Sequence, residues 1–305
     1  MSSILLLFLC LFIGIIIQRI RSFPRNTSLV LNQYVLFIAL PAMALYYLPK
    51  IELTWGLLLP ASVAWIAFGL SYLLFSSLGK IYGWSKKLTG CLIITSGLGN
   101  TSFVGIPVVQ ALYGDEALKT LIIIDLPGTF VVLSTAGVMI ATLYSKQKSN
   151  GDSMLKKMFS FPPLLAFFIG FSMTIFKIDF PEVFSDTLKQ LAATLSPVAL
   201  ISVGFQLKFK AYSKHFRFLF LGLAFQLILF PAVILSLFYF VLGETDLATK
   251  VSIIEAAMAP MITGTILASN YGLKPELSNM MVGFGIPVSF ITLAGWYVLI
   301  EYLLM

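Results

Sequence analysis

Charged residues are scarce in this sequence. Asp, Glu, Lys and Arg together make up 11% of its 305 residues, whereas hydrophobic residues make up 59% and the mean hydropathy is +0.96. A soluble domain has about one quarter charged residues. The composition therefore indicates a polytopic membrane protein.

Residues and motifs of enzyme chemistry are also few. The only histidine is His215, beside Lys214, and the two cysteines, Cys10 and Cys91, lie inside apolar runs and indicate no disulfide. The sequence contains no HExxH, no GxSxG and no phosphate-binding GxxxxGK[ST]. We therefore expect neither an enzyme nor a pump with its own nucleotide site, and no cofactor apart from a coupling ion, Na⁺ or H⁺.

The net charge of +7 is concentrated in short loops between apolar segments, which favours the lipid bilayer over nucleic acid as a partner. A membrane-spanning helix needs about 20 mostly apolar residues. This criterion predicts ten spans, at residues 3–20, 28–48, 54–79, 88–112, 117–144, 159–177, 186–207, 216–242, 248–271 and 276–304. Basic loops follow spans one, three, five and seven, so we expect those loops in the cytoplasm and both termini outside.

The ten spans divide into two halves of five, residues 1–144 and 159–305, joined by a polar cytoplasmic linker at residues 145–158. An odd number of spans gives the halves opposite orientations, so a shared fold would make them an inverted repeat. Short similarities occur in the same order in both halves: Pro41 and Pro197, Tyr113-Gly114 and Tyr271-Gly272, and Pro127 and Pro287.

Span four contains residues that an uninterrupted helix in lipid avoids. Gly97 and Gly99 loosen the backbone, Asn100 and Thr101 are polar, and Pro107 removes an amide donor. Broken backbone in a bilayer is tolerated only where protein or a watery cavity covers it. We therefore predict half of a substrate site here, although such residues also simply kink packed helices.

Span nine supplies the predicted second half of the site. It is expected to be interrupted by Pro260 and Gly264, with Thr263 and Thr265 as polar neighbours. The exposed ends of broken helices attract anions at their N-termini and cations at their C-termini.

Two carboxylates are predicted at membrane depth, Asp125 in span five and Glu255 in span nine. A coupling-ion role, for a proton or Na⁺, and a structural role in a buried pair or backbone cap both fit them. No firm metal site is evident; Na⁺ near Glu255 is the candidate. Asn32 and Gln33 are further site candidates because of the nearby paired proline. Hydrogen bonding between helices is their alternative role, and it is also the usual one for Gln226.

Three segments resemble the signatures of the auxin efflux carrier family: LNQYVLFIALPAMAL, GNTSFVGIPVVQALYGDEAL and APMITGTILASNYGLKPEL. The resemblance implies an all-α fold with two inverted five-helix repeats, related to bile acid–sodium symporters. Spans 1, 2, 6 and 7 would form a scaffold domain. Spans 3–5 and 8–10 would form a transport domain in which spans four and nine cross at their breaks.

The same resemblance implies that Asn100, Thr101 and Pro107 line one side of the substrate site. Thr263, Gly264 and Thr265 would line the other, although the auxin exporters have a proline where this chain has Gly264 or Thr265. Glu255 lies about where the sodium symporters have a cation-binding glutamate. The short linker is similar to that of compact prokaryotic members, so we expect the bacterial inner membrane.

We therefore expect a secondary carrier for a small organic anion, such as malate, malonate or an auxin-like acid, working by elevator-type movement. A membrane anion sensor or scaffold without transport is one alternative, and a sodium-coupled bile-acid-type symporter is another. The sequence does not determine which substrate and which coupling ion the carrier uses, in which direction it transports, or whether it forms a homodimer.

Overall fold

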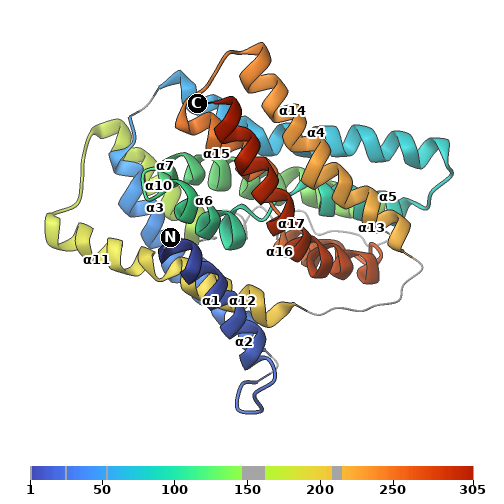
Figure 1. Ribbon diagram of the computed structural model, residues 1–305, viewed down its shortest axis with the longest axis horizontal. Helices are drawn as coiled ribbons and strands as arrows, with labels where there is room; N and C mark the ends of the chain where they lie inside the picture. The colour runs from blue at the N-terminus through green and yellow to red at the C-terminus, as the bar shows by residue number, and fades with distance from the viewer. Residues whose placement is uncertain (1, 25, 53, 146–161, 208–214, 305) are drawn as a thin grey trace. The chain divides into compact units, whose positions relative to one another are not determined.

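The computed structural model describes residues 2–24, 26–52, 54–145, 162–207 and 215–304, with side chains from Leu5 onward. These residues are almost entirely helical (Figure 1), and the described part of the chain contains a single isolated β-bridge and no regular strand. The prediction of an all-α fold is therefore confirmed. Except for Ser145, the predicted linker at residues 145–158 lies outside the described residues.

Within the described part of the chain, six helical segments are long and apolar enough to cross a membrane: Thr27–Lys50, Trp55–Ile81, Ala117–Tyr144, Glu182–Gln206, Phe216–Val241 and Pro275–Leu303. Shorter apolar helices occupy Leu5–Ile17, Thr101–Tyr113 and Pro162–Phe176. A helix lets its backbone groups bond within the segment, which is what lipid requires of a spanning structure. The chain is an integral membrane protein.

The chain forms two compact units. The first consists of residues 1–57, 102–126 and 150–207, and the second of residues 58–101, 127–149 and 208–305.

The helices of the first unit are α1 Ser2–Ile17, α2 Thr27–Tyr34, α3 Leu40–Tyr47, α6 Ile106–Tyr113, α7 Ala117–Ile123, α10 Pro162–Phe176, α11 Glu182–Ala193 and α12 Leu195–Gln206. A π-helical turn, η1 Val35–Ala39, joins α2 to α3, and two 3₁₀ turns, η2 Leu48–Lys50 and η3 Trp55–Leu57, follow α3.

Close backbone approach holds the first unit together. Helices α1 and α12 lie side by side (Figure 1) and cross where Gly14 faces Gly204, so that a Cβ on Gly204 would collide with the Leu11 carbonyl oxygen. Between α10 and the end of α3, Thr174 Oγ1 donates a 2.7 Å hydrogen bond to the Leu48 carbonyl oxygen. Small residues at helix crossings are the usual means by which membrane helices pack without a hydrophobic driving force.

The helices of the second unit are α4 Leu58–Ile81, α5 Lys86–Gly97, α8 Val138–Tyr144, α13 Phe216–Ala224, α14 Phe230–Leu235, α15 Leu247–Ala256, α16 Ile262–Asn270 and α17 Pro275–Leu303. Its π-helical turns are η6 Leu133–Gly137, η7 Phe225–Leu229 and η8 Ser236–Val241. Two further π-helical turns, η4 Thr101–Gly105 and η5 Ile124–Phe130, contain the points at which the chain passes from one unit to the other.

Local chemistry explains where the helices of the second unit begin. The Ser85 hydroxyl accepts from the Leu88 amide at the start of α5, and the Asp246 carboxylate accepts from the Thr249 amide, at 2.8 Å, at the start of α15. Both are side-chain N-caps. Helix α4 packs on α5 through Ser71, whose hydroxyl donates to the Ile93 carbonyl oxygen at 2.9 Å. These contacts fix the position of α5, which carries the interrupted segment of span four.

Candidate functional site

Two helices of the second unit stop abruptly and resume a few residues later. Helix α5 ends at Gly97, and the chain leaves it at Leu98 in an extended conformation, with φ −127° and ψ 114°. Helix α15 ends at Ala256, and α16 begins at Ile262. Glycine lowers the helical preference of the first segment, and Pro260 has no amide to donate within the second.

The two interrupted segments pair with each other through their backbones. The Asn100 amide donates to the Ala259 carbonyl oxygen at 2.8 Å, and the Met261 amide donates to the Leu98 carbonyl oxygen at 2.9 Å. Gly99 and Pro260 thereby form an antiparallel bridge. The pairing satisfies backbone groups that the helix breaks would otherwise leave without partners.

Helix ends of both polarities surround this pair of segments. Helices α5 and α15 present their C-terminal carbonyls, where the partial charge is negative, and α16 presents its N-terminal amides, where it is positive. Glu255, 2% exposed, lies in the last turn of α15, and its backbone carbonyl oxygen is 3.5 Å from a Cβ built on Gly99. The second unit alone can therefore offer an anion one surface and a cation another.

Predicted site residues of span four are buried at this junction: Asn100 and Thr101 lie directly after the extended segment. Those of span nine lie in helix α16, not in the break. The expected interruption at Gly264 is replaced by one at residues 257–261, because the helix resumes as soon as Pro260 is passed. The Gly264 Cα faces Leu98, since a Cβ there would lie 3.3 Å from Leu98 Cδ1.

The hydroxyl groups of the two threonines differ in exposure and bonding. Thr265 is buried, and its Oγ1 donates to the Ile262 carbonyl oxygen at 2.7 Å. The Thr265 carbonyl oxygen accepts from Ser278 Oγ of α17, also at 2.7 Å. Thr263 is only partly buried, in the first turn of α16, and is the better placed of the two for a ligand.

The remaining predicted residues belong to the first unit. Asp125 is buried and accepts a 2.6 Å hydrogen bond from Ser102 Oγ. Pro107 is in the first turn of α6, directly after the π-helical turn η4, and the helical run Thr101–Tyr113 continues through it without a break. Asn32 Oδ1 accepts from Ser202 Oγ of α12, whereas Gln33 is exposed.

Sequence reasoning did not identify the contact of Gln226 with the break. Its Nε2 donates to the Leu98 carbonyl oxygen at 3.1 Å, so this oxygen accepts from both Gln226 and Met261. The two bonded residues are 128 positions apart in the chain, and no local pattern indicates such a pairing. Only the burial of an amide within an apolar span could have suggested it.

Comparison with known proteins identifies the family of the chain. A family model described as membrane transport protein matches residues 1–297. An uncharacterized transporter from Methanocaldococcus jannaschii is 25% identical over 309 residues, covering 98% of this chain and 99% of the relative. An uncharacterized transporter from Methanothermobacter thermautotrophicus is 23% identical over 301 residues, covering 98% of each. The chain therefore belongs to the membrane transport protein family, the auxin efflux carrier family that its sequence resembles.

Proposed function

We propose that the protein is a secondary active transporter of a small organic anion with a carboxylate group, such as malate, malonate or an auxin-like acid. The observation that carries the proposal is the pairing of Leu98 and Asn100 with Ala259 and Met261, which gathers three helix ends in one unit. Amides at a helix N-terminus bind carboxylates, and helices interrupted in this way form the substrate sites of many transporters.

In the proposed site, the carboxylate binds the first-turn amides of α16, with Thr263 and Gly264 from this helix. Asn100 and Thr101, at the interruption of span four, also contact the carboxylate. Thr265 stabilises the first turn of α16 through its hydrogen bond to the Ile262 carbonyl oxygen. The burial of Asn100 at the paired segments and the N-terminal polarity of α16 support these roles. Pro107, Asn32 and Gln33 stay sequence predictions.

The wider architecture is part of the same proposal. Ten spans form two inverted repeats, with spans 1, 2, 6 and 7 as scaffold and spans 3–5 and 8–10 as a transport domain that moves as an elevator. The basic loops support an orientation with both termini outside, and the resemblance to compact prokaryotic members supports a bacterial inner membrane.

Flux into proteoliposomes tests the proposal directly. Purified wild-type protein should accumulate radiolabelled malate, malonate or indole-3-acetate above the level of empty vesicles. Asn100→Ala should weaken apparent substrate affinity by about tenfold or more, because a hydrogen bond to a charged group contributes about 1.5–3 kcal/mol. Asn270→Ala is the matched control, since Asn270 is exposed at the end of α16. Folded protein without flux for any organic acid would point to a sensor, and unchanged affinity in Asn100→Ala would remove the site.

Cation coupling through Glu255 or Asp125 requires a separate measurement. Glu255 is buried at the end of α15, where carbonyls favour a cation, and this placement supports it as the first choice. Uptake by Glu255→Gln and Asp125→Asn should be measured under imposed Na⁺ and pH gradients. The coupling residue is the one whose neutral variant loses the response to a gradient; if both variants keep it, both carboxylates are structural.

A further inference from the structure

Trp296 of α17 makes a hydrogen bond to the backbone of another helical segment. Its indole Nε1 donates to the Leu227 carbonyl oxygen at 2.8 Å, and the two residues are 69 positions apart in the chain. Both belong to the second unit, so the contact lies within one compact body. Leu227 is buried and Trp296 is partly buried, so the bond is shielded from water.

A proline explains why this carbonyl oxygen needs a donor from a side chain. In an α-helix the Leu227 carbonyl would accept from the amide of the residue four positions later. That residue is Pro231, in the first turn of α14, and a proline has no amide hydrogen. The indole N–H of Trp296 therefore supplies a donor where the backbone at residue 231 has none, and buried backbone carbonyls require one.

The residue before Leu227 connects the same turn to the paired segments. Gln226 and Leu227 are consecutive in the π-helical turn η7. The buried Gln226 side chain donates through Nε2 to the Leu98 carbonyl oxygen at 3.1 Å. Because a carbonyl oxygen can only accept, the nitrogen end of the amide must face Leu98. Two neighbouring residues of η7 thus link α17 to the interruption of span four.

The width of η7 determines where the Gln226 side chain points. A π turn is closed by hydrogen bonds over five residues instead of four, so its side chains are spaced at different angles from those of an α-helix. The preceding helix α13 is packed tightly: a Cβ on Gly222 would lie 2.7 Å from the nearest atom of α5 and 2.9 Å from the nearest atom of α17. Closing η7 into an α turn would therefore rotate Gln226 away from Leu98.

Tryptophan in a membrane helix has another common role, as an anchor at the interface between lipid and water. An anchor directs its N–H towards the headgroups and needs no particular acceptor in the protein. The Trp296 N–H instead points at a buried backbone oxygen. The two roles differ in what they require, because an anchor needs an aromatic ring and the bond to Leu227 needs a donor.

We propose that Trp296 is a positioning residue for the substrate site. By donating to the Leu227 carbonyl oxygen it keeps η7 in its π-helical form, and η7 directs Gln226 to the Leu98 carbonyl of the paired segments. Trp296 therefore acts on the site through Gln226. The inference rests on the proposed function only in treating the paired segments as the place where substrate binds.

Hydrogen–deuterium exchange of the purified protein in detergent, without any organic acid, tests the inference. Trp296→Phe keeps an aromatic ring and removes the donor. Peptides containing the Asn100 and Met261 amides, which pair the two segments, should exchange about tenfold faster, as expected for the loss of one hydrogen bond. The Thr249 amide should keep its wild-type rate, because the Asp246 carboxylate caps it independently.

Three further variants separate the hydrogen bond from general stability. Trp296→His retains a ring N–H and loses the second ring, so the paired segments should exchange as in wild type. Trp65→Phe is the matched control, since Trp65 is 47% exposed on α4 of the same unit and should not affect these amides. Gln226→Leu should accelerate the same amides, and adding Trp296→Phe to it should have no further effect, because both changes remove one contact.

Two results would overturn the inference. Wild-type exchange in Trp296→Phe would leave Trp296 as a lipid anchor, and equal acceleration in Trp296→His would assign the effect to ring packing. If Trp296→Phe fails to fold, Trp296→His decides the question, since wild-type exchange supports the role of the bond and faster exchange refutes it.

The outcome is independent of transport, because the exchange measurement needs no substrate. Accelerated exchange in Trp296→Phe, together with wild-type protein that shows no flux, refutes the transport proposal alone. Unchanged exchange in a protein that carries an organic anion refutes the positioning role alone.

Discussion

Replacing Gly285 of α17 with alanine should displace Pro260, which lies in the interrupted segment of span nine. A Cβ at residue 285 would lie 2.5 Å from Pro260 Cδ, 2.8 Å from Pro260 Cγ and 3.0 Å from Leu223 Cδ2. Carbon atoms in favourable contact are about 3.5–4.0 Å apart, so the proline ring would have to move by about 1 Å. The backbone bonds of Ala259 and Met261 on either side of Pro260 resist this movement.

The expected magnitude follows from two opposing effects. Glycine to alanine favours a helix by up to about 1 kcal/mol, whereas overpacking a well-filled interior costs about 1–3 kcal/mol. Gly295→Ala in the same helix isolates the first effect, because no heavy atom lies within 4 Å of a Cβ at that position. Gly285→Ala should therefore be less stable than Gly295→Ala by about 1–3 kcal/mol.

Thermal unfolding in detergent measures this difference, which corresponds to about 1.5–2 °C per kcal/mol for a chain of 305 residues. Organic-acid affinity in proteoliposomes should fall in Gly285→Ala and stay at the wild-type value in Gly295→Ala, because only the first change shifts the paired segments. If the melting temperature of Gly285→Ala equals or exceeds that of Gly295→Ala, the Pro260 ring does not pack against Gly285 of α17.

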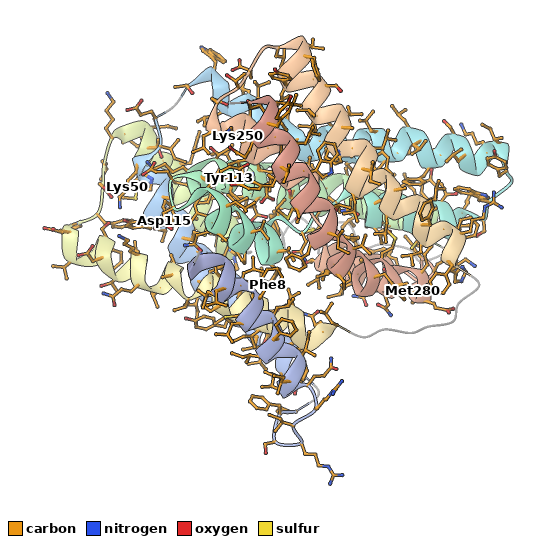
Figure 2. The ribbon with its side chains drawn as sticks, viewed as in Figure 1. Phe8, Lys50, Tyr113, Asp115, Lys250 and Met280 are labelled. Carbon is orange, nitrogen blue, oxygen red and sulfur yellow. The ribbon has the colours of Figure 1, made fainter. Side chains whose placement is uncertain are left out.

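Two further predictions concern packing and charge. Gly204→Ala places a Cβ against the Leu11 carbonyl oxygen, which belongs to the backbone and cannot rotate away. The yield of monodisperse protein in size-exclusion chromatography should therefore fall sharply. Gly69→Ala is the control and should leave this yield unchanged, because its Cβ would meet no atom within 4 Å. Lys250 of α15, labelled in Figure 2, pairs with Glu301 of α17 at 3.0 Å and is partly exposed. Lys250→Gln should therefore cost no more than about 1 kcal/mol, measured by thermal unfolding at low and high salt, and a larger loss would mean that the pair is shielded from solvent.

The helical segments were predictable from the sequence because lipid imposes a simple rule on backbone hydrogen bonding. Runs of about 20 apolar residues locate helices, and described helices occur in each predicted span. Gly97, Gly99 and Pro260 correctly indicated that two of these spans are interrupted, since each residue acts on its own backbone.

The exact limits of the breaks were less predictable. Pro107 and Gly264 look equivalent to Gly99 and Pro260 in a sequence, yet both lie within helices in the structure. A π-helical turn such as η4, directly before Pro107, is the kind of local adjustment that lets a membrane helix accommodate a proline, and a glycine can serve close packing, as Gly264 does against Leu98. The role of such a residue depends on its neighbours in space.

The contacts that hold the break were beyond prediction for a similar reason. Gln226 and Leu98, or Ser96 and Gly222, are more than a hundred positions apart in the chain and no spacing rule relates them. The sequence indicated only that a buried amide in a membrane helix finds a partner. The structure identifies that partner as a backbone carbonyl within the break.

The link between the two interrupted segments consists of main-chain amides and carbonyls, from Leu98 and Asn100 to Ala259 and Met261. Any amino acid except proline can supply an amide at residues 100 and 261. Side chains along the segments are thus replaceable while the frame that presents them persists. Divergence of substrate preference among such proteins needs no redesign of their architecture, and selectivity can evolve one side chain at a time.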